Sequence, residues 1–238
     1  MSPEPASLQD RGASRWLTWV KARAAGRRRG AQTRRIAVGM KVIGVLGGVA
    51  SGKTFVARAL AELGAGVLDA DGVGHEVLRA PEIEEIVRKH WGEGVFGPDG
   101  HVDRKRLAGV VFGDSPAAAE SRKRLEQILH PEIERRLRRE AERMAASGLP
   151  AAVLDAPLLS EAGWVGQCDL LIYVDAPRPL RLARARQRGW NEKDFAAREG
   201  VQESLDYKRR LADWVIDTSR SPEDTRAQVE RFWHSHFG

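Results

Sequence analysis

One stretch, residues 41–54 with the sequence KVIGVLGGVASGKT, constrains the fold of this chain more than any other segment. It opens with an apolar run that predicts a buried strand, and a helix-compatible run follows it over residues 55–63. Between them lies the pattern G-x-x-x-x-G-K-[ST], which is satisfied by Gly47, Gly52, Lys53 and Thr54. A strand, a glycine-rich turn and a helix in this order are the context that a phosphate-binding loop requires. The segment therefore predicts an α/β fold with such a loop after its first strand.

The chemistry of this loop follows from its residue types. Glycines allow backbone N–H groups to converge on an anion, and the N-terminus of the following helix adds unpaired donors and partial positive charge. Lys53 can reach the outer phosphates of a nucleotide, and the hydroxyl of Thr54 suits a Mg²⁺ ligand. The alternative is an ordinary glycine-rich turn between a strand and a helix, but such a turn needs neither the lysine nor the hydroxyl. We therefore expect a site for a nucleoside triphosphate.

Length and composition suit a globular α/β protein. A chain of 238 residues can build one α/β domain with inserted subdomains, and 42% hydrophobic and 30% charged residues are ordinary for such a fold. The single cysteine, Cys168, excludes an internal disulfide and fits a reducing compartment, so we expect a cytoplasmic protein with a buried structural thiol. No uninterrupted apolar stretch approaches the ~18–20 residues that a membrane span needs, so we expect no membrane partner.

The basic charge of the chain is concentrated at its N-terminal end. Residues 1–35 hold nine Arg or Lys against two acidic residues, a net charge of +7, whereas the whole chain carries +6. Residues 36–238 are therefore close to neutral, at −1, and lack the basic footprint of a nucleic-acid-binding protein. We interpret residues 1–39 as a disordered, dispensable leader, translated upstream of a natural start at Met40. An organelle transit peptide and an arm that touches nucleic acid are the alternatives.

The second predicted strand ends in two acidic residues. Residues 67–71 read VLDAD, so Asp69 and Asp71 are expected at the carboxyl end of the sheet, where open α/β sheets bind their ligands. Two residues apart on one strand, they would point to the same side. The alternative is a strand end with solvated acids.

The segments that follow predict an inserted helical region and then the rest of the sheet. Helical patterns dominate residues 72–150, and the longest of them, over residues 116–146, contains a possible break at His130-Pro131. Further strands are expected over residues 151–155, 170–174 and 212–217. The helix after residue 178 holds Arg181, Arg184, Arg186 and Arg188. We interpret residues 178–202 as a phosphate-facing lid in preference to a merely solvated face.

Several strings now coincide in order and spacing with one family. They are GVLGGVASGKT, VLDAD, FGPDGHVDR, LEQILHPEI, LDAPLLSE, RLARARQRGW and LADWVIDT. Together they make residues 41–219 resemble the dephospho-CoA kinases. The resemblance implies a P-loop kinase core with a parallel sheet, a helical substrate-binding insertion over about residues 72–150 and an arginine-rich lid, all within residues 40–238. It also implies transfer of the ATP γ-phosphoryl group to the ribose 3′-hydroxyl of dephospho-CoA.

The resemblance assigns roles to individual residues. Catalytic roles fall to Lys53, Asp71 and Arg184. The ATP site is formed by Gly47, Gly48, Val49, Ala50, Ser51, Gly52, Lys53, Thr54, Phe55 and Arg188. Mg²⁺ is placed at Thr54, with Asp155 reaching it through water. The acceptor contacts Asp71, His75, His130, Asp155, Leu158 and Glu161. ATP and dephospho-CoA are the implied partners, and a monomer or weak oligomer is the implied state.

Four residues depart from the common pattern of the family. Leu46 replaces a Thr, Ala50 a Gly, His75 an Arg and Thr218 an Asn, which puts one hydroxyl contact and one phosphate contact of the acceptor in doubt. Another small-metabolite or nucleoside kinase on the same scaffold is the alternative function. A regulatory nucleotide switch is disfavoured because no guanine-reading Asn-Lys-x-Asp string occurs.

Overall fold

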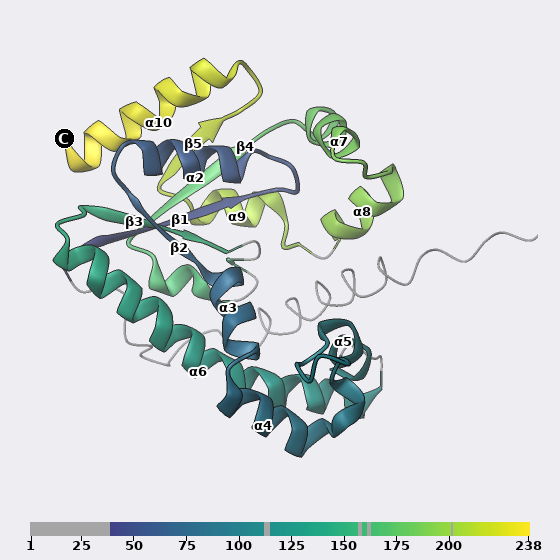
Figure 1. Cartoon of the computed structure of the whole chain (residues 1–238). Helices are drawn as coiled ribbons and strands as arrows, with labels where there is room; N and C mark the ends of the chain where they lie inside the picture. The colour runs from purple at the N-terminus through teal and green to yellow at the C-terminus, as the bar shows by residue number, and fades with distance from the viewer. Residues whose placement is uncertain (1–38, 112–114, 157–158, 161–162, 201) are drawn as a thin grey trace, which may run out of the picture.

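The computed structural model describes residues 39–111, 115–156, 159–160, 163–200 and 202–238. Within these residues a five-stranded, all-parallel sheet has the strand order β2-β3-β1-β4-β5 (Figure 1). The strands are β1 Lys41–Gly47, β2 Gly66–Asp69, β3 Ala151–Asp155, β4 Leu170–Asp175 and β5 Trp214–Asp217. The predicted α/β class with a parallel sheet is confirmed.

Both faces of the three central strands, β3, β1 and β4, are buried, because these strands are apolar along most of their length. On β1, Val42 and Leu46 face one hydrophobic cluster, and Ile43 and Val45 face another on the opposite side. β3 and β4 alternate between the same two clusters. Continuous apolar runs of this kind are typical of parallel sheets that are covered by helices on both sides.

The helices are α2 Lys53–Glu62, α3 Ala70–Leu78, α4 Pro81–Trp91, α5 Arg104–Val111, α6 Pro116–Ala146, α7 Arg178–Gln187, α8 Glu192–Gly200, α9 Leu205–Leu211 and α10 Pro222–Phe237, with short 3₁₀ turns η1 Glu93–Val95 and η2 Trp164–Gln167. α2 and α10 cover one face of the sheet, and α6 and α9 lie against the other (Figure 1). α9 was not predicted. No helix within the described ranges is both long and apolar enough to span a bilayer.

The four helices α3–α6 lie between β2 and β3 in the chain and have a hydrophobic cluster of their own, which includes Val87, Phe96 and Leu107. α6 connects this cluster to the sheet. Its first half packs Leu125, Ile128 and Leu129 on the inserted cluster, and its second half buries Leu137 and Ala141 against the sheet.

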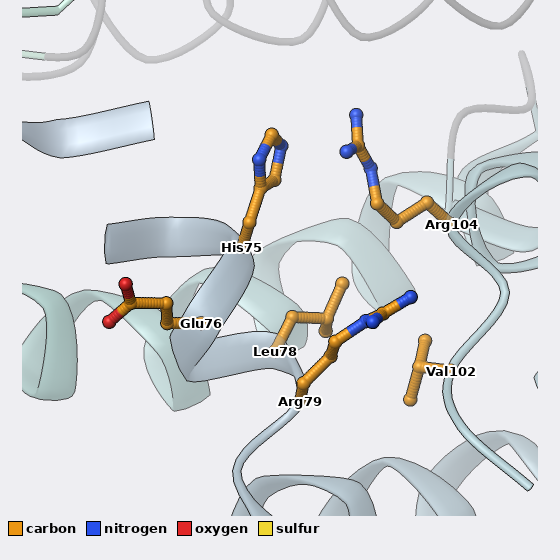
Figure 2. A pocket seen from close by; sticks show the side chains of 6 residues that line it. All are labelled: His75, Glu76, Leu78, Arg79, Val102 and Arg104. Carbon is orange, nitrogen blue, oxygen red and sulfur yellow. The ribbon is translucent and has the colours of Figure 1, made fainter. Parts of the chain in front are cut away.

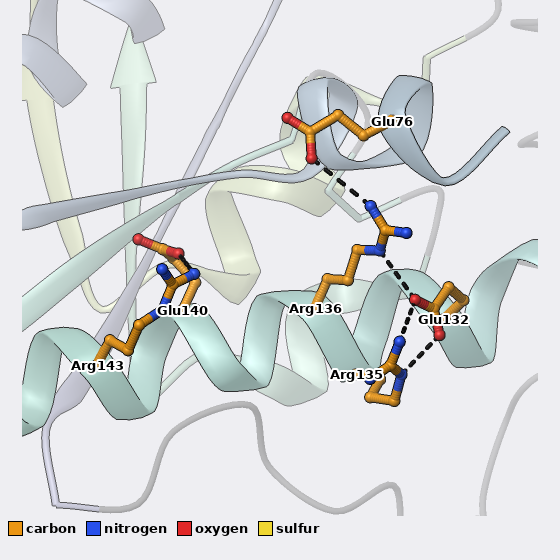
Figure 3. Close-up of polar contacts among 6 residues, drawn as sticks. All are labelled: Glu76, Glu132, Arg135, Arg136, Glu140 and Arg143. Atoms are coloured by element: carbon orange, nitrogen blue, oxygen red, sulfur yellow. Dashed lines mark hydrogen bonds and ion pairs between the residues drawn. The ribbon is translucent and has the colours of Figure 1, made fainter. Parts of the chain in front are cut away.

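The predicted break at His130-Pro131 does not occur, because α6 continues through Pro131. A proline inside a helix removes one backbone hydrogen bond and costs about 3 kcal/mol. Packing on both sides of Pro131 offsets this cost. Arg136 connects α6 to α3. Its Nε donates to Glu132 of α6 at 2.9 Å, and its Nη1 lies 3.7 Å from Oε2 of Glu76 on α3 (Figure 3).

Candidate active site at the carboxyl edge of the sheet

The phosphate-binding loop connects β1 to α2 as predicted. Gly52 caps α2 in the left-handed region with φ 104°, a conformation that glycine adopts without strain. Gly47, with φ 151°, has no room for a side chain, since a Cβ there would lie 2.7 Å from both the Ser51 hydroxyl and the Val174 carbonyl oxygen. The loop therefore depends on glycine at both positions for its shape.

Two side chains of the loop suit a bound polyphosphate. Lys53 Nζ donates to the carbonyl oxygens of Gly47 at 3.2 Å and Gly48 at 2.8 Å, which holds the ammonium group across the loop. Ser51 is 1% exposed, and its hydroxyl makes no hydrogen bond within the described residues. Buried hydroxyls are nearly always paired, so this one fits a loop that binds a polar ligand. Thr54 and Phe55 follow in the first turn of α2, with Thr54 exposed.

Ala50 shows how the loop tolerates the loss of a family glycine. It has φ 56° and is the only non-glycine residue with positive φ among the described residues. For an L-residue with a Cβ this conformation costs about 1–2 kcal/mol. Its methyl group is buried in a small cluster with Val49, Ala185 of α7 and Phe195 of α8. Apolar contact with the helices of the proposed lid therefore offsets part of the strain.

The two acids after β2 do not share a strand, and this part of the sequence prediction is wrong. β2 ends at Asp69, and Asp71 lies in the first turn of α3. Asp69 is the N-cap, and its carboxylate accepts a hydrogen bond from the N–H of Gly72 at 2.9 Å. Asp-Ala-Asp-Gly could have been read as a helix start, because aspartate is a favoured N-cap. The two carboxylates therefore have different local roles.

Asp155 lies at the end of β3, in register with Asp69. Burial, then the charge of Asp69, raise the pKa of its carboxyl above the usual range; Lys53 opposes this shift and Asp71 adds to it. The Asp155 carboxylate is thus close enough to all three groups for their charges to act on it. The structure brings together the lysine of the loop and the acids that follow two neighbouring strands.

The arginines of α7 differ sharply in environment. Arg184 donates from Nη1 to the Thr218 hydroxyl at 3.0 Å and the Ser51 carbonyl at 3.3 Å, and from Nη2 to the Thr218 carbonyl at 2.6 Å. Its pKa is lowered by burial and by the neighbouring charge of Arg188. Arg188 is the exposed C-cap of α7. Arg184 thus lies against the loop, and Arg188 lies at the end of its helix.

Two further groups, for which no contact with the loop was predicted, also hold it. The Thr218 hydroxyl, next after β5, donates to the Ser51 carbonyl at 2.6 Å. Arg181 is 2% exposed and donates from Nη1 to the Val49 carbonyl at 3.4 Å, while its Nη2 pairs with Glu199 of α8 at 2.7 Å. The four-arginine run signalled Arg181, but nothing in the sequence signalled its burial or its partner.

The remaining predicted acceptor residues are only partly described. His75 follows Asp71 by one turn of α3, and its Nε2 lies 3.7 Å from Oδ2 of Asp71. His130 lies on α6 with its ring stacked on that of Trp164 at a centroid distance of 6.2 Å. Leu158 and Glu161 lie outside the described residues. Leu46, which replaces a family threonine, is buried in the core.

The single cysteine is a separate matter. Burial raises the pKa of the Cys168 thiol to about 12, which fits an unreactive structural cysteine.

The donor set fits Mg²⁺ in the form in which kinases use it. Within the described ranges no three His, Cys, Asp or Glu side chains gather into a metal cage. Mg²⁺ in kinases is held by one or two protein oxygens together with water and substrate phosphates. Two oxygen groups of this kind are the Thr54 hydroxyl, at the start of α2, and the Asp155 carboxylate. The charge of Lys53 opposes the rise that burial causes in the pKa of the Asp155 carboxyl, so the two side chains lie near each other.

Comparison with known proteins agrees with this geometry. The family model for dephospho-CoA kinase matches residues 41–224. The dephospho-CoA kinase of Symbiobacterium thermophilum is 41% identical over 203 residues, which are 84% of this chain and 82% of that protein. The enzyme of Geobacter sulfurreducens is 37% identical over 201 residues, 83% of this chain and 100% of that protein.

Solved structures share the fold. The crystal structure of TT1252 from Thermus thermophilus has a TM-score of 0.71 and 32% identity, and the match covers 84% of this chain and 100% of that one. Dephospho-CoA kinase from Campylobacter jejuni, at 22% identity and a TM-score of 0.55, matches 83% of this chain and 98% of its own and supports the fold alone. Since the family model spans most of the sequence and the relatives match over most of their length, this chain belongs to the dephospho-CoA kinase family.

Proposed function

We propose that this protein phosphorylates the ribose 3′-hydroxyl of dephospho-CoA with ATP, giving CoA and ADP, the last step of CoA biosynthesis. The observation that carries the proposal is the family match over residues 41–224. The site supports it, because a phosphate-binding loop lies beside acids at the carboxyl ends of neighbouring strands. Phosphoryl transfer needs alignment and charge neutralisation more than covalent help, and these groups can supply both.

The loop is the proposed site of the ATP phosphates. Its backbone N–H groups and the N-terminus of α2 favour negative charge, and Lys53 adds a full positive charge, already held across the loop by the Gly47 and Gly48 carbonyls. Mg²⁺, when bound near Thr54 and Asp155, supplies further charge neutralisation of the phosphates. Arg184 and Arg188 add positive charge from α7, and the lid helices help to exclude water as a competing acceptor.

Asp71 is the proposed base, and Asp69 is the proposed structural cap. Asp71 is exposed in the first turn of α3, close enough to Asp155 to affect its pKa. In this position its carboxylate can accept the proton of the acceptor hydroxyl and orient the line of attack. Asp69 already accepts from the Gly72 N–H, so its main contribution is to start the helix that carries Asp71.

A paired substitution tests this division of roles. ADP release is measured with ATP in the presence and absence of dephospho-CoA, on the wild type, Asp71→Asn and Asp69→Asn. We expect Asp71→Asn to lower turnover by ~10²–10⁴-fold with ATP binding by calorimetry nearly unchanged. Asp69→Asn is the matched control: asparagine caps a helix about as well as aspartate, so its turnover should fall much less.

Three outcomes would overturn these assignments. Near-normal turnover of Asp71→Asn removes Asp71 as the base, and a larger loss in Asp69→Asn transfers the role to Asp69. Faster ADP release with a different hydroxyl acceptor, such as a nucleoside, would favour another small-metabolite kinase. We infer further that the protein works in the cytoplasm. We also infer that it is a monomer or weak oligomer, which size-exclusion chromatography can test.

A further inference from the structure

The carboxylate of Asp71 has one polar partner in the part of the chain that the structure describes. That partner is His75, one turn later on α3, whose Nε2 lies 3.7 Å from Oδ2 of Asp71. Asp69, by contrast, already accepts a hydrogen bond from the N–H of Gly72 at 2.9 Å. Among these contacts, only the one with His75 can fix the orientation of the Asp71 carboxylate.

The geometry of the helix directs the His75 side chain toward Asp71. Residues four apart lie on the same helix face, and side chains lean toward the N-terminus of their helix. Figure 2 shows the ring of His75 standing off α3, while the side chain of Glu76 is directed elsewhere. A histidine ring that carries a proton on Nε2 can donate it to a carboxylate. At 3.7 Å the contact is longer than a hydrogen bond, but contacts of catalytic groups are often long until the substrate binds.

The two ends of α3 differ in how firmly the sequence holds them. At the C-terminal end, Val77 is fully buried in the hydrophobic cluster of the inserted helices. At the N-terminal end, Asp71 is followed by Gly72 and Gly74, and glycine is among the poorest helix-forming residues. His75 lies on the C-terminal side of both glycines. Its contact with Asp71 therefore connects the weakly held first turn to the buried end of the helix.

Repulsion between acids is a second reason why Asp71 needs a partner. Burial, then the charge of Asp69, raise the pKa of the Asp155 carboxyl, and the charge of Asp71 adds to this rise. The carboxylates of Asp71 and Asp155 therefore repel each other. This repulsion alone would turn the exposed Asp71 side chain away from the sheet edge. An N–H donor on the same face of α3 opposes that movement.

We propose that His75 is a positioning residue that holds the Asp71 carboxylate toward the acceptor hydroxyl; this inference rests on the proposed function. His75 does not need to remove the proton, because the side chain of Asp71 is 45% exposed and can release it to water. Direct contact of His75 with the acceptor is the alternative, since His75 also borders a hollow of about 230 Å³. Positioning acts on kcat through Asp71, whereas direct contact acts on KM for the acceptor and does not require Asp71.

A double-mutant cycle separates the two roles. The constants kcat, KM for dephospho-CoA and KM for ATP are measured for the wild type, His75→Leu, Asp71→Asn and the double variant. Exposed pairs contribute little, so we expect His75→Leu to lower kcat about 2- to 5-fold with both KM values nearly unchanged. In the Asp71→Asn background the same substitution should not lower kcat further, because the effects of residues that act through one group are not additive.

Two more variants control for the loss of the ring. His75→Gln keeps an N–H donor and should restore most of kcat, and His90→Leu makes the same substitution at an exposed position of α4 and should match the wild type. An unchanged kcat in His75→Leu, additive losses in the double variant, a Gln variant as slow as the Leu variant, or a rise in KM for dephospho-CoA without a fall in kcat would each overturn the positioning role. Lack of wild-type turnover with dephospho-CoA would instead overturn the proposed function.

Discussion

Arg178 and Arg181 offer a direct test of how α7 and α8 are held against the phosphate-binding loop. Both arginines pair with the same carboxylate, Glu199 of α8, at 2.9 Å and 2.7 Å. Both guanidinium groups also lie near the Phe195 ring, at 5.3 Å and 5.6 Å from its centroid. Their burial differs: the side chain of Arg178 is 49% exposed and that of Arg181 is 3% exposed. The matched substitutions Arg178→Met and Arg181→Met therefore separate the effect of burial from that of the partner.

The contacts set the expected magnitudes. Arg178→Met removes an exposed ion pair and should lower the free energy of unfolding by less than about 1 kcal/mol. Arg181→Met also removes donors from the Ala176 carbonyl at 3.1 Å and the Val49 carbonyl at 3.4 Å. A buried acceptor left unpaired costs about 1–3 kcal/mol, and burial of the methionine side chain offsets part of this. We expect a loss of about 2–4 kcal/mol, or roughly 2–4 °C in Tm per kcal/mol for a domain of this size.

The pH dependence of this loss follows from Glu199. Burial alone would raise the pKa of its carboxyl, but hydrogen bonds from Arg178 and Arg181 outweigh burial and lower it. A depressed pKa in the folded state stabilises the protein above the unfolded pKa of about 4.3, and this stabilisation is lost as pH falls through the folded pKa. The deficit of Arg181→Met relative to the wild type should therefore be full at pH 7 and smaller below pH 4.

Urea denaturation and ATP titration calorimetry measure the two consequences. Because Arg181 touches Val49, and a Cβ on Gly48 would lie 2.8 Å from its Nη1, its loss should loosen the loop and weaken ATP binding several-fold. Arg178→Met should leave ATP binding unchanged. Equal effects of the two substitutions on both stability and ATP affinity would refute the conclusion that the buried arginine couples α7 and α8 to the loop.

Three further substitutions test separate parts of the site. Lys53→Ala should lower turnover by more than about tenfold with an unchanged circular dichroism spectrum; a smaller fall would contradict its role at the phosphates. Asp155→Asn should raise the free energy of unfolding at pH 7 by roughly 0.5–2 kcal/mol, because a raised pKa means that its charge opposes folding once pH exceeds about 4. Urea denaturation should show that gain shrinking toward pH 4, and a loss of stability at pH 7 would contradict it. Thr218→Val should cost about 1–3 kcal/mol by leaving the Ser51 carbonyl with one donor fewer, whereas Thr218→Ser should retain most of the stability in thermal melts; equal losses would rule out the hydroxyl as the cause.

The sequence predicted the parts of this protein that depend on local pattern. The strand, the loop and the helix over residues 41–63 are found as expected, as are the parallel sheet and the inserted helices. These follow from apolar runs, glycine spacing and helical periodicity, which act over a few residues. The possible break at His130-Pro131 does not occur, because the two halves of α6 are held by two different hydrophobic clusters, and tertiary packing of that kind has no local signal.

The acids after β2 were misread for a different reason. Alternation within VLDAD places Asp69 and Asp71 on one side of a strand, but the chain turns into α3 after Asp69. The deciding contact is the hydrogen bond from the Gly72 N–H to the Asp69 carboxylate. Aspartate is a favoured N-cap, so the sequence did carry a signal for the helix start at Asp69, and the alternation of VLDAD was given more weight than that signal.

The arginines of α7 mark the limit of what helical spacing can predict. Arg181, Arg184 and Arg188 are three and four residues apart and so share a face, while Arg186 lies off it and pairs with Glu192 at the surface. The spacing could therefore have distinguished Arg186 from the other three arginines. It could not have predicted which of those three is buried most deeply. Arg181 is buried because Gly48 has no side chain where its guanidinium lies, and Arg184 meets the loop because Thr218 follows β5 beside Ser51. Both contacts are made between segments that are far apart in the sequence. The burial of each arginine therefore depends on the folded edge of the sheet, and the position of the arginine along α7 does not determine it.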